Sequence, residues 1–579
     1  MENISLSSNG QPYFYFTVAS DYNTTGNISL PLTGLSMNFS VNAGQLTKVY
    51  LPSAIYYPSG SEVISNFGFH ITTNQPASIV AHHHRIFFSE ATTVLPTTEI
   101  ADNYIVMAHK DDGSGSVFGY SEFSIVSTAD NSLIEIVPSA YTSGGKPPGL
   151  PFSVTLNKGQ IYQVQSINDL TGTTVREKSG NKIAVFSGAN RSNVLSSFNC
   201  SGADDHLFEQ NYPVTGWGNE YISVPFLNFG ANQFRILASQ NNTLVQFNCS
   251  NTKMLQAGQY FDTISSNPMY INSPKPIQLG QFITSCSNTM ADPNFVLHKS
   301  LSYYSKKVIF DAFSDYDTSF VNIIVRSPAT SSINLDANQV TFNPLISYPN
   351  YSYAQVPLGK GTHIIQSDSG FYAFAYGASF HDAYAYQTGY DGFRQTENSI
   401  SFKYLNNLCQ DTIIGFEIIP NLNFDSFNWQ FSNGTVSVDQ NPNVIFNESG
   451  NYTISLSVTD SLGCIYGGSN TLQINDCGTY TVSAYCPNVF TPNNDETNDK
   501  WKPIFDGNIN SILNYELYIY NRWGLKIFET TRINGFWDGY TTSGSLCNEG
   551  VYYYVVKYNT NENGQLAPKS MNGFITLAR

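Results

Sequence analysis

The residues best suited to chemistry form one acidic group beside a histidine. Asp204, Asp205, His206 and Glu209 lie close together in the chain. Paired carboxylates next to an imidazole can bind a cation or transfer protons as general acid and base. No candidate nucleophile accompanies them, so we predict no catalytic residue and no enzyme. We interpret the group as a structural staple in a loop and keep Asp204, Asp205 and Glu209 as a candidate cation site.

Three consecutive histidines, His82, His83 and His84, have the composition of a metal cluster. Adjacent side chains of a strand point to opposite faces, so only His82 and His84 could share an ion. No Asp, Glu or Cys adjoins them, and we therefore interpret the three residues as the polar end of a strand rather than a metal site.

A second set of oxygen-bearing side chains is suited to calcium, which takes six to eight oxygen ligands. The set does not match the spacing of an EF-hand, and turns rich in Asn and Asp commonly bond their own backbone amides. Calcium is the one cofactor that the sequence suggests. The residues of this loop are Asn493, Asn494, Asp495, Asn498 and Asp499, of which Asp495, Asn498 and Asp499 are the candidate ligands.

Aromatic residues raise the alternative of sugar binding, because rows of exposed rings stack on sugar faces. Trp217 and the tyrosines Tyr384, Tyr386 and Tyr390 could form such a platform. We favour the simpler interpretation that these tyrosines are buried in sandwiches. The other tryptophans, assigned to cores or motifs, are Trp429, Trp501, Trp523 and Trp537.

The elements that position these residues are strands. Charged residues make up only 12% of the chain and aromatic residues 14%, with Asn, Ser, Thr and Gly between short apolar runs. This composition suits pleated, half-buried strands and predicts an all-β fold. The net charge of −16 and the lack of a basic cluster exclude nucleic-acid binding. No apolar run approaches the ~18 residues of a transmembrane helix.

The first residues, Met1 to Ser5, lack the positive and apolar regions of a signal peptide. Either the chain is cytoplasmic or it follows a removed leader, and the C-terminal motifs described below favour the second alternative. Eight cysteines are present without a CxxC spacing. This pattern speaks against zinc and favours extracellular disulfides.

The first four hundred residues contain an internal repeat. Glycine turns at Gly44, Gly159, Gly258 and Gly361 lie 115, 99 and 103 residues apart. Glycine suits such turns because a positive φ costs it nothing. Units of this size with several short strands predict four β-sandwiches, arranged as a rod or a compact array. An apolar first strand opens each unit, at 14–18, 123–127, 234–238 and 321–325.

The repeat region resembles the N-terminal domain of the IgGFc-binding-protein family over about 12–390, most closely over 155–295. The resemblance implies an extracellular adhesive or mucin-associated module, without carrying over an immunoglobulin ligand. The stretches that carry it are Asp169-Leu170-Thr171-Gly172-Thr173, Asp205-His206-Leu207-Phe208-Glu209-Gln210, Trp217-Gly218-Asn219-Glu220-Tyr221 and Ala291-Asp292-Pro293.

Residues 401–476 resemble a PKD domain, which in its relatives is a spacer. Trp429-Gln430-Phe431-Ser432-Asn433-Gly434 is similar to the WDFGDG stretch of that family, with Gln430 and Asn433 replacing two aspartates. The alternation of Tyr452, Ile454, Leu456 and Val458 places one strand face on a sandwich core. Cys409 and Cys464 bracket this module, and we predict that they form a disulfide across its two sheets.

Residues 484–579 resemble the gliding motility-associated C-terminal domain, the type B sorting signal of the type IX secretion system. Glu496 stands where the family usually has glycine. We predict a second disulfide, Cys486–Cys547, within this module. The matching residues are Pro487, Asn488, Phe490, Thr491, Pro492, Asn493, Asp495, Asn498, Asp499, Tyr520, Asn521, Arg522, Trp523, Gly524, Trp537, Asp538, Gly539, Gly550, Tyr552 and Arg579.

These observations predict three regions: adhesive sandwich repeats over 1–398, a PKD-like spacer over 399–477 and a sorting domain over 484–579. We expect a secreted adhesin or surface-filament component, linked to gliding motility, that meets the type IX translocon and a barrel-type outer-membrane partner. The alternatives are a polysaccharide-binding accessory protein and a secreted hydrolase using Asp205, His206 and Glu209. The adhesive ligand is open. The pairing among Cys200, Cys249, Cys286 and Cys477 is also open, with Cys200–Cys286 and Cys249–Cys286 preferred.

Overall fold

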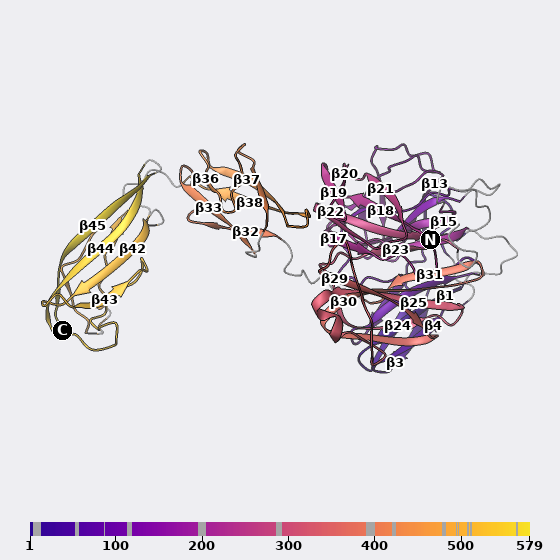
Figure 1. Cartoon of the computed structure of the whole chain (residues 1–579), viewed down its shortest axis with the longest axis horizontal. Coiled ribbons are helices and arrows are strands. Elements are labelled where there is room, and N and C mark those ends of the chain that lie inside the picture. Colours follow the sequence, from indigo (N-terminus) through magenta and orange to yellow (C-terminus); the bar gives the residue numbers. More distant parts are fainter. Residues whose placement is uncertain are drawn as a thin grey trace. The chain divides into compact units, whose positions relative to one another are not determined.

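The protein is described by a computed structural model (Figure 1). The structure describes all residues except 4–12, 53–56, 86, 113–118, 195–203, 285–291, 390–399, 420–423, 477–481, 494, 496, 507–508, 510–511 and 563–564. The chain divides into two compact units. The first comprises Met1–Ser399 and Thr459–Gly467, and the second Ile400–Val458 and Gly468–Arg579.

The predicted all-β fold is confirmed: the described elements are strands, apart from 3₁₀ turns such as η2 (Val214–Gly216) and η3 (Ser327–Ser332). Antiparallel pairing dominates, with alternating buried and exposed residues along strands such as β11 (Ser132–Val137). That alternation follows from the period of two in a strand, which turns every second side chain towards the core.

The first unit contains four sandwiches, here called the first to fourth repeats. The first comprises β1 (Tyr13–Ser20), β2 (Thr24–Leu30), β3 (Leu35–Val41), β4 (Gln45–Tyr50), β6 (His70–Thr73), β7 (Ser78–His84) and β8 (Glu90–Thr93). The second comprises β9 (Asn103–Ile105), β10 (Ser121–Ser127), β11, β12 (Phe152–Leu156), β13 (Ile161–Ser166), β14 (Thr174–Glu177), β15 (Ile183–Ser192) and β16 (Asp205–Gln210), and β5 (Val63–Ser65) pairs with its β13.

The third repeat comprises β17 (Gly218–Ser223), β18 (Asn232–Ala238), β19 (Thr243–Phe247), β20 (Asn251–Leu255), β21 (Tyr260–Ser265), β22 (Met269–Ile283) and β23 (Phe295–His298). The fourth comprises β24 (Ser305–Ala312), β25 (Thr318–Arg326), β26 (Asn334–Leu335), β27 (Asn338–Gln339), β28 (Asn343–Pro344), β29 (Tyr351–Leu358), β30 (Gly361–Ser379) and β31 (Asp382–Gln387). The long strands β22 and β30 each pair in both sheets of their repeat.

The four repeats share one strand order, which explains the repeated sequence pattern. One sheet of each runs β4-β1-β7-β8, β13-β10-β15-β16, β21-β18-β22-β23 and β29-β25-β30-β31. The facing sheets run β3-β2-β6, β12-β11-β14-β9, β20-β19-β22-β17 and β27-β26-β30-β24. The apolar first strands recognised in the sequence are therefore equivalent in space.

The glycine turns are equivalent in the first three repeats. The amides of Gly44, Gly159 and Gly258 each donate to the carbonyl that ends the first strand, at 2.9 Å. All three glycines have a φ between +72° and +82°, which the turn requires. Gly361 differs, because it follows β29, the strand that the other glycines precede. Gly361 is therefore not equivalent to the other three glycines, because it lies one turn later in its repeat.

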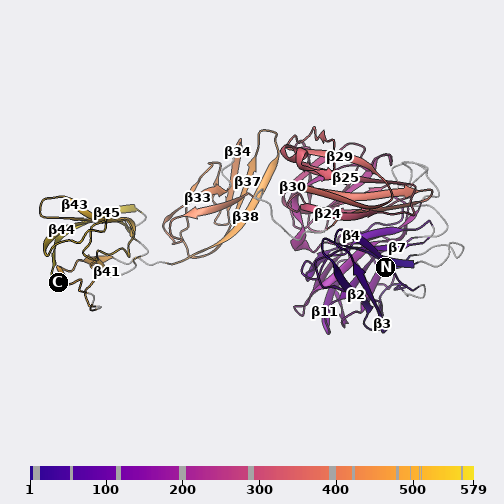
Figure 2. The same cartoon turned by 90° about the horizontal axis from the view of Figure 1, so that it is seen from below.

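The repeats form a closed ring rather than a rod. The last strands of the repeats, here called the ring strands, lie against one another in the order β8, β16, β23, β31 and back to β8. The fourth repeat also meets the first where β24 lies against β1 and β4. Both views show β24 next to β4 (Figures 1 and 2). Each ring strand is the outer strand of its sheet, so the ring covers edges that would otherwise be open to pairing.

Shared apolar cores hold neighbouring repeats together. Phe208 of the second repeat packs into the core of the first, and Tyr15 of the first packs into that of the fourth. Leu207 joins Phe282 between the second and third repeats, and Tyr270 joins a core between the third and fourth. Apolar surface is therefore buried at all four junctions, which favours the ring over separate repeats.

The second unit holds a fifth sandwich and a C-terminal sandwich. The fifth comprises β32 (Ser401–Leu405), β33 (Ile413–Ile419), β34 (Ser426–Phe431), β35 (Val436–Ser437), β36 (Asn443–Ile445), β37 (Gly450–Thr459) and β38 (Ile465–Ile474). Its sheets run β32-β33-β36 and β35-β34-β37-β38, with Trp429 fully buried against Phe402, Phe416 and Phe431.

The C-terminal sandwich comprises β39 (Ser483–Tyr485), β40 (Val489–Phe490), β41 (Ile504–Asp506), β42 (Ile512–Tyr520), β43 (Lys526–Thr530), β44 (Gly550–Glu562) and β45 (Gln565–Leu577). Its main sheet runs β40-β45-β44-β42-β43, and β40 pairs parallel to β45. Phe490, Trp501, Leu517 and Trp537 form the core beneath this sheet.

Candidate functional site

The acidic residues singled out in the sequence do not converge on one point. Asp204 forms an ion pair with Arg191. Glu209 accepts a hydrogen bond from the backbone amide of Leu297 at 3.2 Å, on the neighbouring ring strand. Asp205 is fully buried and its Oδ2 has no hydrogen-bond partner. The three carboxylates therefore have three separate environments.

A different group of carboxylates meets at the centre of the ring. Glu90, Asp205, Asp292 and Asp382 come from the ends of β8, β16 and β31 and from the residues before β23, and all are buried. Glu90 accepts from the amide of Phe295 at 2.7 Å, and Asp382 accepts from a serine hydroxyl, that of Ser89, at 3.1 Å. We call these four residues the carboxylate centre.

Burial favours the protonated form of the residues in the carboxylate centre. Burial, reinforced by the mutual repulsion of Asp382, Asp292 and Glu90, raises the pKa of Asp205 well above its ordinary value. Burial raises the pKa of Asp292 to about 7, and it also raises the pKa values of Glu90 and Asp382. Protonated carboxyls can donate and accept hydrogen bonds between strands without the cost of a buried charge.

No group of three or more His, Cys, Asp or Glu side chains is arranged to hold a metal ion among the described residues. The cation assignment to Asp204, Asp205 and Glu209 therefore stays a prediction that the observed side-chain positions do not support. The sequence missed Glu90 and Asp382 because they lie far along the chain from Asp205. In the sequence, Asp292 was noted only as part of the family stretch Ala291-Asp292-Pro293 and not as a member of an acidic group.

The three histidines end strand β7, as predicted, but two of them are deeply buried. His82 stacks on Phe313 with ring centroids 4.5 Å apart. His83 Nδ1 lies 3.3 Å from Nε2 of His206, so this pair of histidines joins the first repeat to the second. Burial lowers the pKa of His206 to about 3 and also lowers that of His83, so both rings are neutral at pH 7. Neutral rings suit aromatic packing in a core.

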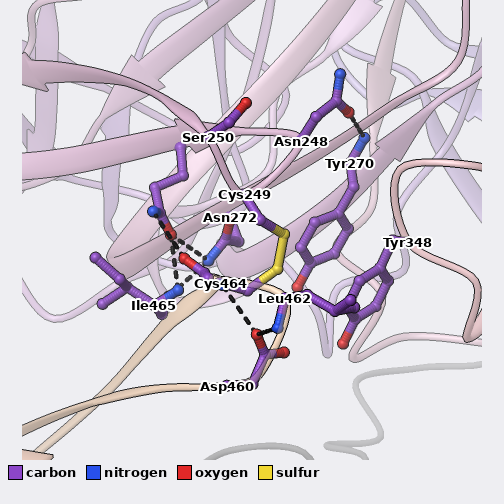
Figure 3. The surroundings of a disulfide bond; sticks show 12 residues. Asn248, Cys249, Ser250, Tyr270, Asn272, Tyr348, Asp460, Leu462, Cys464 and Ile465 are labelled. Atoms are coloured by element: carbon purple, nitrogen blue, oxygen red, sulfur yellow. Dashed lines mark hydrogen bonds between the residues drawn. A yellow bond between two sulfur atoms is a disulfide. The ribbon is translucent and has the colours of Figure 1, made fainter. Parts of the chain in front are cut away.

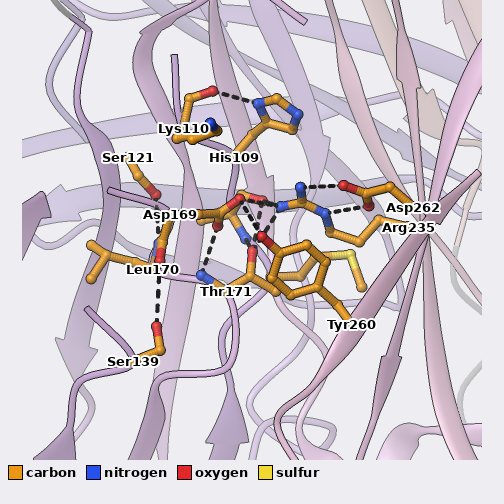
Figure 4. A network of polar contacts seen from close by, with 12 residues as sticks. His109, Lys110, Ser121, Ser139, Asp169, Leu170, Thr171, Arg235, Tyr260 and Asp262 are labelled. Atoms are coloured by element: carbon orange, nitrogen blue, oxygen red, sulfur yellow. Dashed lines mark hydrogen bonds and ion pairs between the residues drawn. The ribbon is translucent and has the colours of Figure 1, made fainter. Parts of the chain in front are cut away.

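Arg235 is the centre of a buried ionic network that the sequence did not reveal (Figure 4). Its guanidinium forms ion pairs with Asp169 at 2.7 Å and with Asp262 at 2.8 Å. It also lies 4.1 Å above the ring of Tyr260 and bonds the hydroxyl of Thr171. Asp169 and Thr171 belong to one of the family stretches, so that stretch joins the second repeat to the third.

The proposed aromatic platform is not present at the described positions. Trp217 is buried and its indole donates to the carbonyl of Tyr212 at 3.2 Å. Tyr384 and Tyr386 are fully buried in the core shared by the first and fourth repeats, which confirms the simpler interpretation of these tyrosines. Tyr390 lies outside the described residues.

In the C-terminal sandwich, motif residues far apart in sequence meet around Arg579. Its guanidinium donates to the carbonyl oxygens of Cys547 at 2.7 Å and of Gly539 at 3.3 Å. A Cβ placed on Gly539 would lie 3.2 Å from the ring of Pro492, so the glycine permits this close approach. The motifs around Pro492, Trp537–Gly539 and Arg579 therefore form one structural cluster.

The turn after β42 presents a large aromatic side chain to solvent. The side-chain oxygen of Asn521 accepts from the amides of Trp523 at 2.9 Å and Leu525 at 3.0 Å, and Gly524 adopts a φ of +78°. Trp523 is 84% exposed. Trp523 therefore does not pack in the core: the side chain of Asn521 holds the turn, and the indole is exposed.

The loop proposed for calcium bonds largely to itself. Asp495 Oδ1 accepts from the amide of Thr497 at 2.9 Å, and its Oδ2 accepts from the side chain of Asn493 at 3.0 Å. Asn494 and Glu496 lie outside the described residues. Calcium binding by Asp495, Asn498 and Asp499 stays a prediction.

Both predicted disulfides are wrong. Cys464 is bonded to Cys249 of the third repeat, which also excludes Cys249–Cys286. Cys464 lies in the turn between β37 and β38, and this turn belongs to the first unit. Cys409 is disulfide-bonded to a residue other than Cys464. Cys200, Cys286 and Cys477 lie outside the described residues.

Cys486 and Cys547 are free thiols. Cys486 contacts the hydroxyl of Tyr554, whereas Cys547 contacts that of Tyr552. Each thiol therefore has its own tyrosine partner on β44, and the two cysteines are not bonded to each other. A shared module was therefore not sufficient ground for pairing the two cysteines.

Family models match three regions of the chain. The IgGFc binding protein model matches 90–377, the PKD domain model 410–475 and the CHU_C type IX secretion signal domain model 484–577. The chain carries a type IX secretion signal domain. The three resemblances seen in the sequence are thereby confirmed. The type IX secretion signal domain indicates export to the cell surface or the extracellular space. Among the described residues, none of the helices combines the length and apolar character that a membrane crossing demands.

Several solved structures match the chain at low identity. Dimeric latent PorU from Porphyromonas gingivalis is 13% identical with a TM-score of 0.12, and the match covers 58% of this chain and 34% of PorU. The BSP domain of a biofilm associated protein is 9% identical, with 83% and 97% covered and a TM-score of 0.14. A tetra-tandem repeat of a large adhesion protein is 11% identical, with 86% and 95% covered and a TM-score of 0.13. These scores carry no structural argument. No curated protein matches the chain significantly.

Proposed function

We propose that this protein is a non-enzymatic adhesin or surface-filament component, exported by the type IX secretion system and active on gliding cells. The observation that carries the proposal is the type IX secretion signal domain joined to a ring of four sandwiches. The ring buries its polar residues at its centre, so its outer sheets supply the surface available for adhesion. We also propose regional boundaries at 1–398, 399–477 and 484–579, supported by the matched ranges.

A hydrolase is the weakest alternative. Asp205 and His206 are fully buried, and Glu209 is nearly so. A general acid or base must reach a substrate proton within hydrogen-bond distance. Instead, His206 contacts the carbonyl of Ala189 on β15, and Glu209 accepts from the amide of Leu297 on β23. Burial of the same side chains supports a structural role in the ring.

A glycan-binding accessory role remains the second candidate, and one observation favours it. On the outer face of the secretion signal domain, Tyr553 pairs across the strands with Phe574 and with Tyr520. Tyr553 and Phe574 are each about half exposed, at 50% and 53%. Adjacent exposed rings can stack on sugar faces, so this face would bind neutral glycans.

The export proposal is tested by fusing residues 484–579 to a fluorescent reporter with a periplasmic leader in a type IX-competent cell. The reporter is expected on the surface or in the medium, and it is expected in the periplasm of a cell that lacks the translocon. A folded domain that leaves the reporter in the periplasm of the competent cell would falsify the assignment.

We further propose that a barrel-type outer-membrane partner receives the signal domain through its loops around 493–499 and 521–524. The chain is acidic, with a net charge of −16. A basic patch on the partner would complement that charge, so binding should weaken as salt rises. Binding that is insensitive to salt between 50 and 500 mM, on the order of a threefold change in Debye length, would contradict the electrostatic part of the proposal.

Adhesion is tested with the full chain on an array of glycans and extracellular-matrix proteins. Retention on matrix proteins supports the adhesin, and retention on insoluble glycans alone supports the accessory role. Loss of glycan retention in Tyr553→Ala would assign it to the aromatic face. Turnover of any ester, peptide or glycan substrate that disappears in His206→Ala would instead establish the hydrolase.

A further inference from the structure

The turn between β37 and β38 belongs to the ring of repeats, although its strands belong to the PKD domain. Residues Thr459–Gly467 are part of the first compact unit. Within this segment Cys464 is disulfide-bonded to Cys249, 215 positions earlier in the chain (Figure 3). We call Thr459–Gly467 the latch turn.

The latch turn has a defined shape of its own. Oδ1 of Asp460 accepts from the amides of Leu462 and Cys464, both at 2.9 Å. The amide of Gly463 donates to the carbonyl of Asp460 at 3.0 Å, and Gly463 has a φ of +85°. An aspartate that caps its own turn, followed by a glycine in the left-handed region, fixes the backbone before any partner is met.

Two amide side chains of the third repeat bind the backbone of the latch turn. Gln246 accepts from the amide of Ile465 at 2.7 Å and donates to the carbonyl of Gly463 at 3.3 Å. Asn272 donates to the carbonyl of Ile465 at 2.6 Å. These side chains supply the hydrogen bonds that a neighbouring strand would otherwise supply, so the recess is matched to this backbone.

Apolar and aromatic contacts complete the recess. Cys249 and Cys464 are both buried in the core that the third and fourth repeats share. The hydroxyls of Tyr466 and Tyr348 lie 2.9 Å apart, and Tyr348 stacks on Tyr270 with ring centroids 3.9 Å apart. A Cβ placed on Gly467 would lie 2.5 Å from Pro274, so the fit leaves no room for a side chain there.

We propose that the latch turn is a covalent latch that carries load past the connecting segment 390–399. The backbone joins the repeats to the PKD domain through residues 390–399, and the Cys249–Cys464 disulfide provides a second connection. In an exported protein held at one end and pulled at the other, tension would pass from the third repeat through the disulfide to β37 and β38. The third repeat and the PKD domain would then be joined by two covalent connections rather than one.

Cleavage of the connecting segment tests the second connection directly. A protease recognition sequence flanked by Gly-Ser is inserted within 390–399 of the full chain, and the purified protein is cut. On denaturing gels without reductant the cut chain should still migrate as one species of 64.0 kDa plus the insert. Reductant should separate it into two fragments. Separation without reductant in the parent chain would overturn the proposal.

Cysteine variants identify the bond. The paired change Cys249→Ser with Cys464→Ser should release the fragments without reductant, whereas the matched control Cys409→Ser should not. Fragments that stay joined in the paired variant would show that another disulfide spans the cut, which would also overturn the proposal. The parent chain with and without reductant supplies the same comparison if a variant fails to fold.

Single-molecule pulling between the two ends measures the load path. Unfolding of the oxidised parent should release about 700–770 Å less chain than unfolding of the paired variant, because the disulfide encloses 215 residues. A difference of only about 190 Å would indicate the Cys409–Cys464 loop instead. Equal lengths in parent and paired variant would contradict the latch. Neither measurement depends on export or on the adhesive ligand, so failure of the latch is distinguishable from failure of the proposed function.

Discussion

At the scale of single residues, environment rather than residue type decides what the acidic and aromatic side chains do. Asp205 faces other buried carboxyls and is held protonated, while Asp204, its neighbour in sequence, forms an ion pair with Arg191. Trp537 is fully buried and Trp523 is solvent-exposed in the same domain. Adjacent residues of a strand face opposite sides, so proximity in sequence does not give a shared role.

Glu209 makes stability depend on pH. Burial raises its pKa from 4.5 to about 8. Between these values the folded state keeps a proton that the unfolded state has lost, so the free energy of unfolding falls as pH rises, by up to about 4 kcal/mol for this group. Glu209→Gln should remove that part of the pH dependence and stabilise the protein at pH 8. Urea unfolding at pH 5 and pH 8 measures the difference.

The matched control for this variant is Glu135→Gln in the second repeat, where the side chain is 33% exposed and pairs with Lys178. The control should show the pH dependence of the parent chain. A Glu209→Gln protein with the same slope as the parent would mean that Glu209 is ionised in the fold.

Substitutions of Trp523 and Trp537 distinguish a role in recognition by the secretion system from a role in folding of the signal domain. Trp523→Ala should change the stability of the signal domain by less than about 0.5 kcal/mol, because the indole is exposed. Trp537→Ala should cost about 3–5 kcal/mol, because it empties the core beside Phe490. Export of the reporter should fall in Trp523→Ala although the domain melts at the parental temperature. Normal export of that variant would remove Trp523 from the recognition surface.

At the scale of elements, turns and ring strands depend on close backbone contacts. Each ring strand is at the edge of its sheet, where backbone groups would otherwise be unpaired. Side chains form hydrogen bonds with backbone groups of the neighbouring ring strand instead. The amide of Gln210 on β16 donates to Thr92 on β8 at 3.0 Å, and Glu209 accepts from Leu297 on β23. A second turn of the second repeat, at Gly172, also touches the glycine turn of the third repeat at Gly258.

Gly172→Ala should destabilise the protein more than Gly180→Ala. Both glycines lie in the second repeat with a φ of +93° and +84°. Each substitution places alanine in the left-handed region, at a cost of about 1 kcal/mol. A Cβ on Gly172 would also lie 2.3 Å from the carbonyl oxygen of Gly258, whereas Gly180 has open space within 4 Å. Overpacking should add roughly 1–3 kcal/mol at Gly172, measured by chemical denaturation. Equal losses would show that the two turns do not need their close approach.

At the scale of the whole molecule, closure of the ring distinguishes this protein from a string of independent modules. Every junction between neighbouring repeats contains an apolar core, and the ring strands contact one another in a closed cycle. A repeat removed from the ring would expose both a core surface and a sheet edge.

The repeats should therefore unfold together. Calorimetry of the full chain is expected to show one transition for the ring, with the calorimetric enthalpy equal to the van't Hoff enthalpy. Gly172→Ala should move that whole transition to lower temperature. Separate transitions for individual repeats, or a shift confined to part of the heat absorption, would show that the junctions do not couple the repeats.

The sequence by itself determined the all-β class, the apolar first strand of each repeat, three of the four glycine turns and the secretion signal domain. Strand alternation, positive-φ turns and dense local motifs are properties of neighbouring residues, and a single sequence displays them directly. The family resemblances extended these local patterns to the three matched regions.

Only the tertiary structure decided the ring, the carboxylate centre, the burial of His82 and His83 and the Cys249–Cys464 bond. Each of these depends on residues that are distant in sequence: Glu90 meets Asp205 and Asp382, and Cys249 meets Cys464. Which distant surfaces meet is set by the packing of whole sandwiches, and the same local pattern is compatible with a rod or with a ring. Contacts between repeats therefore determine the environment of these side chains, because separation along the chain does not give the distance between two residues in the fold.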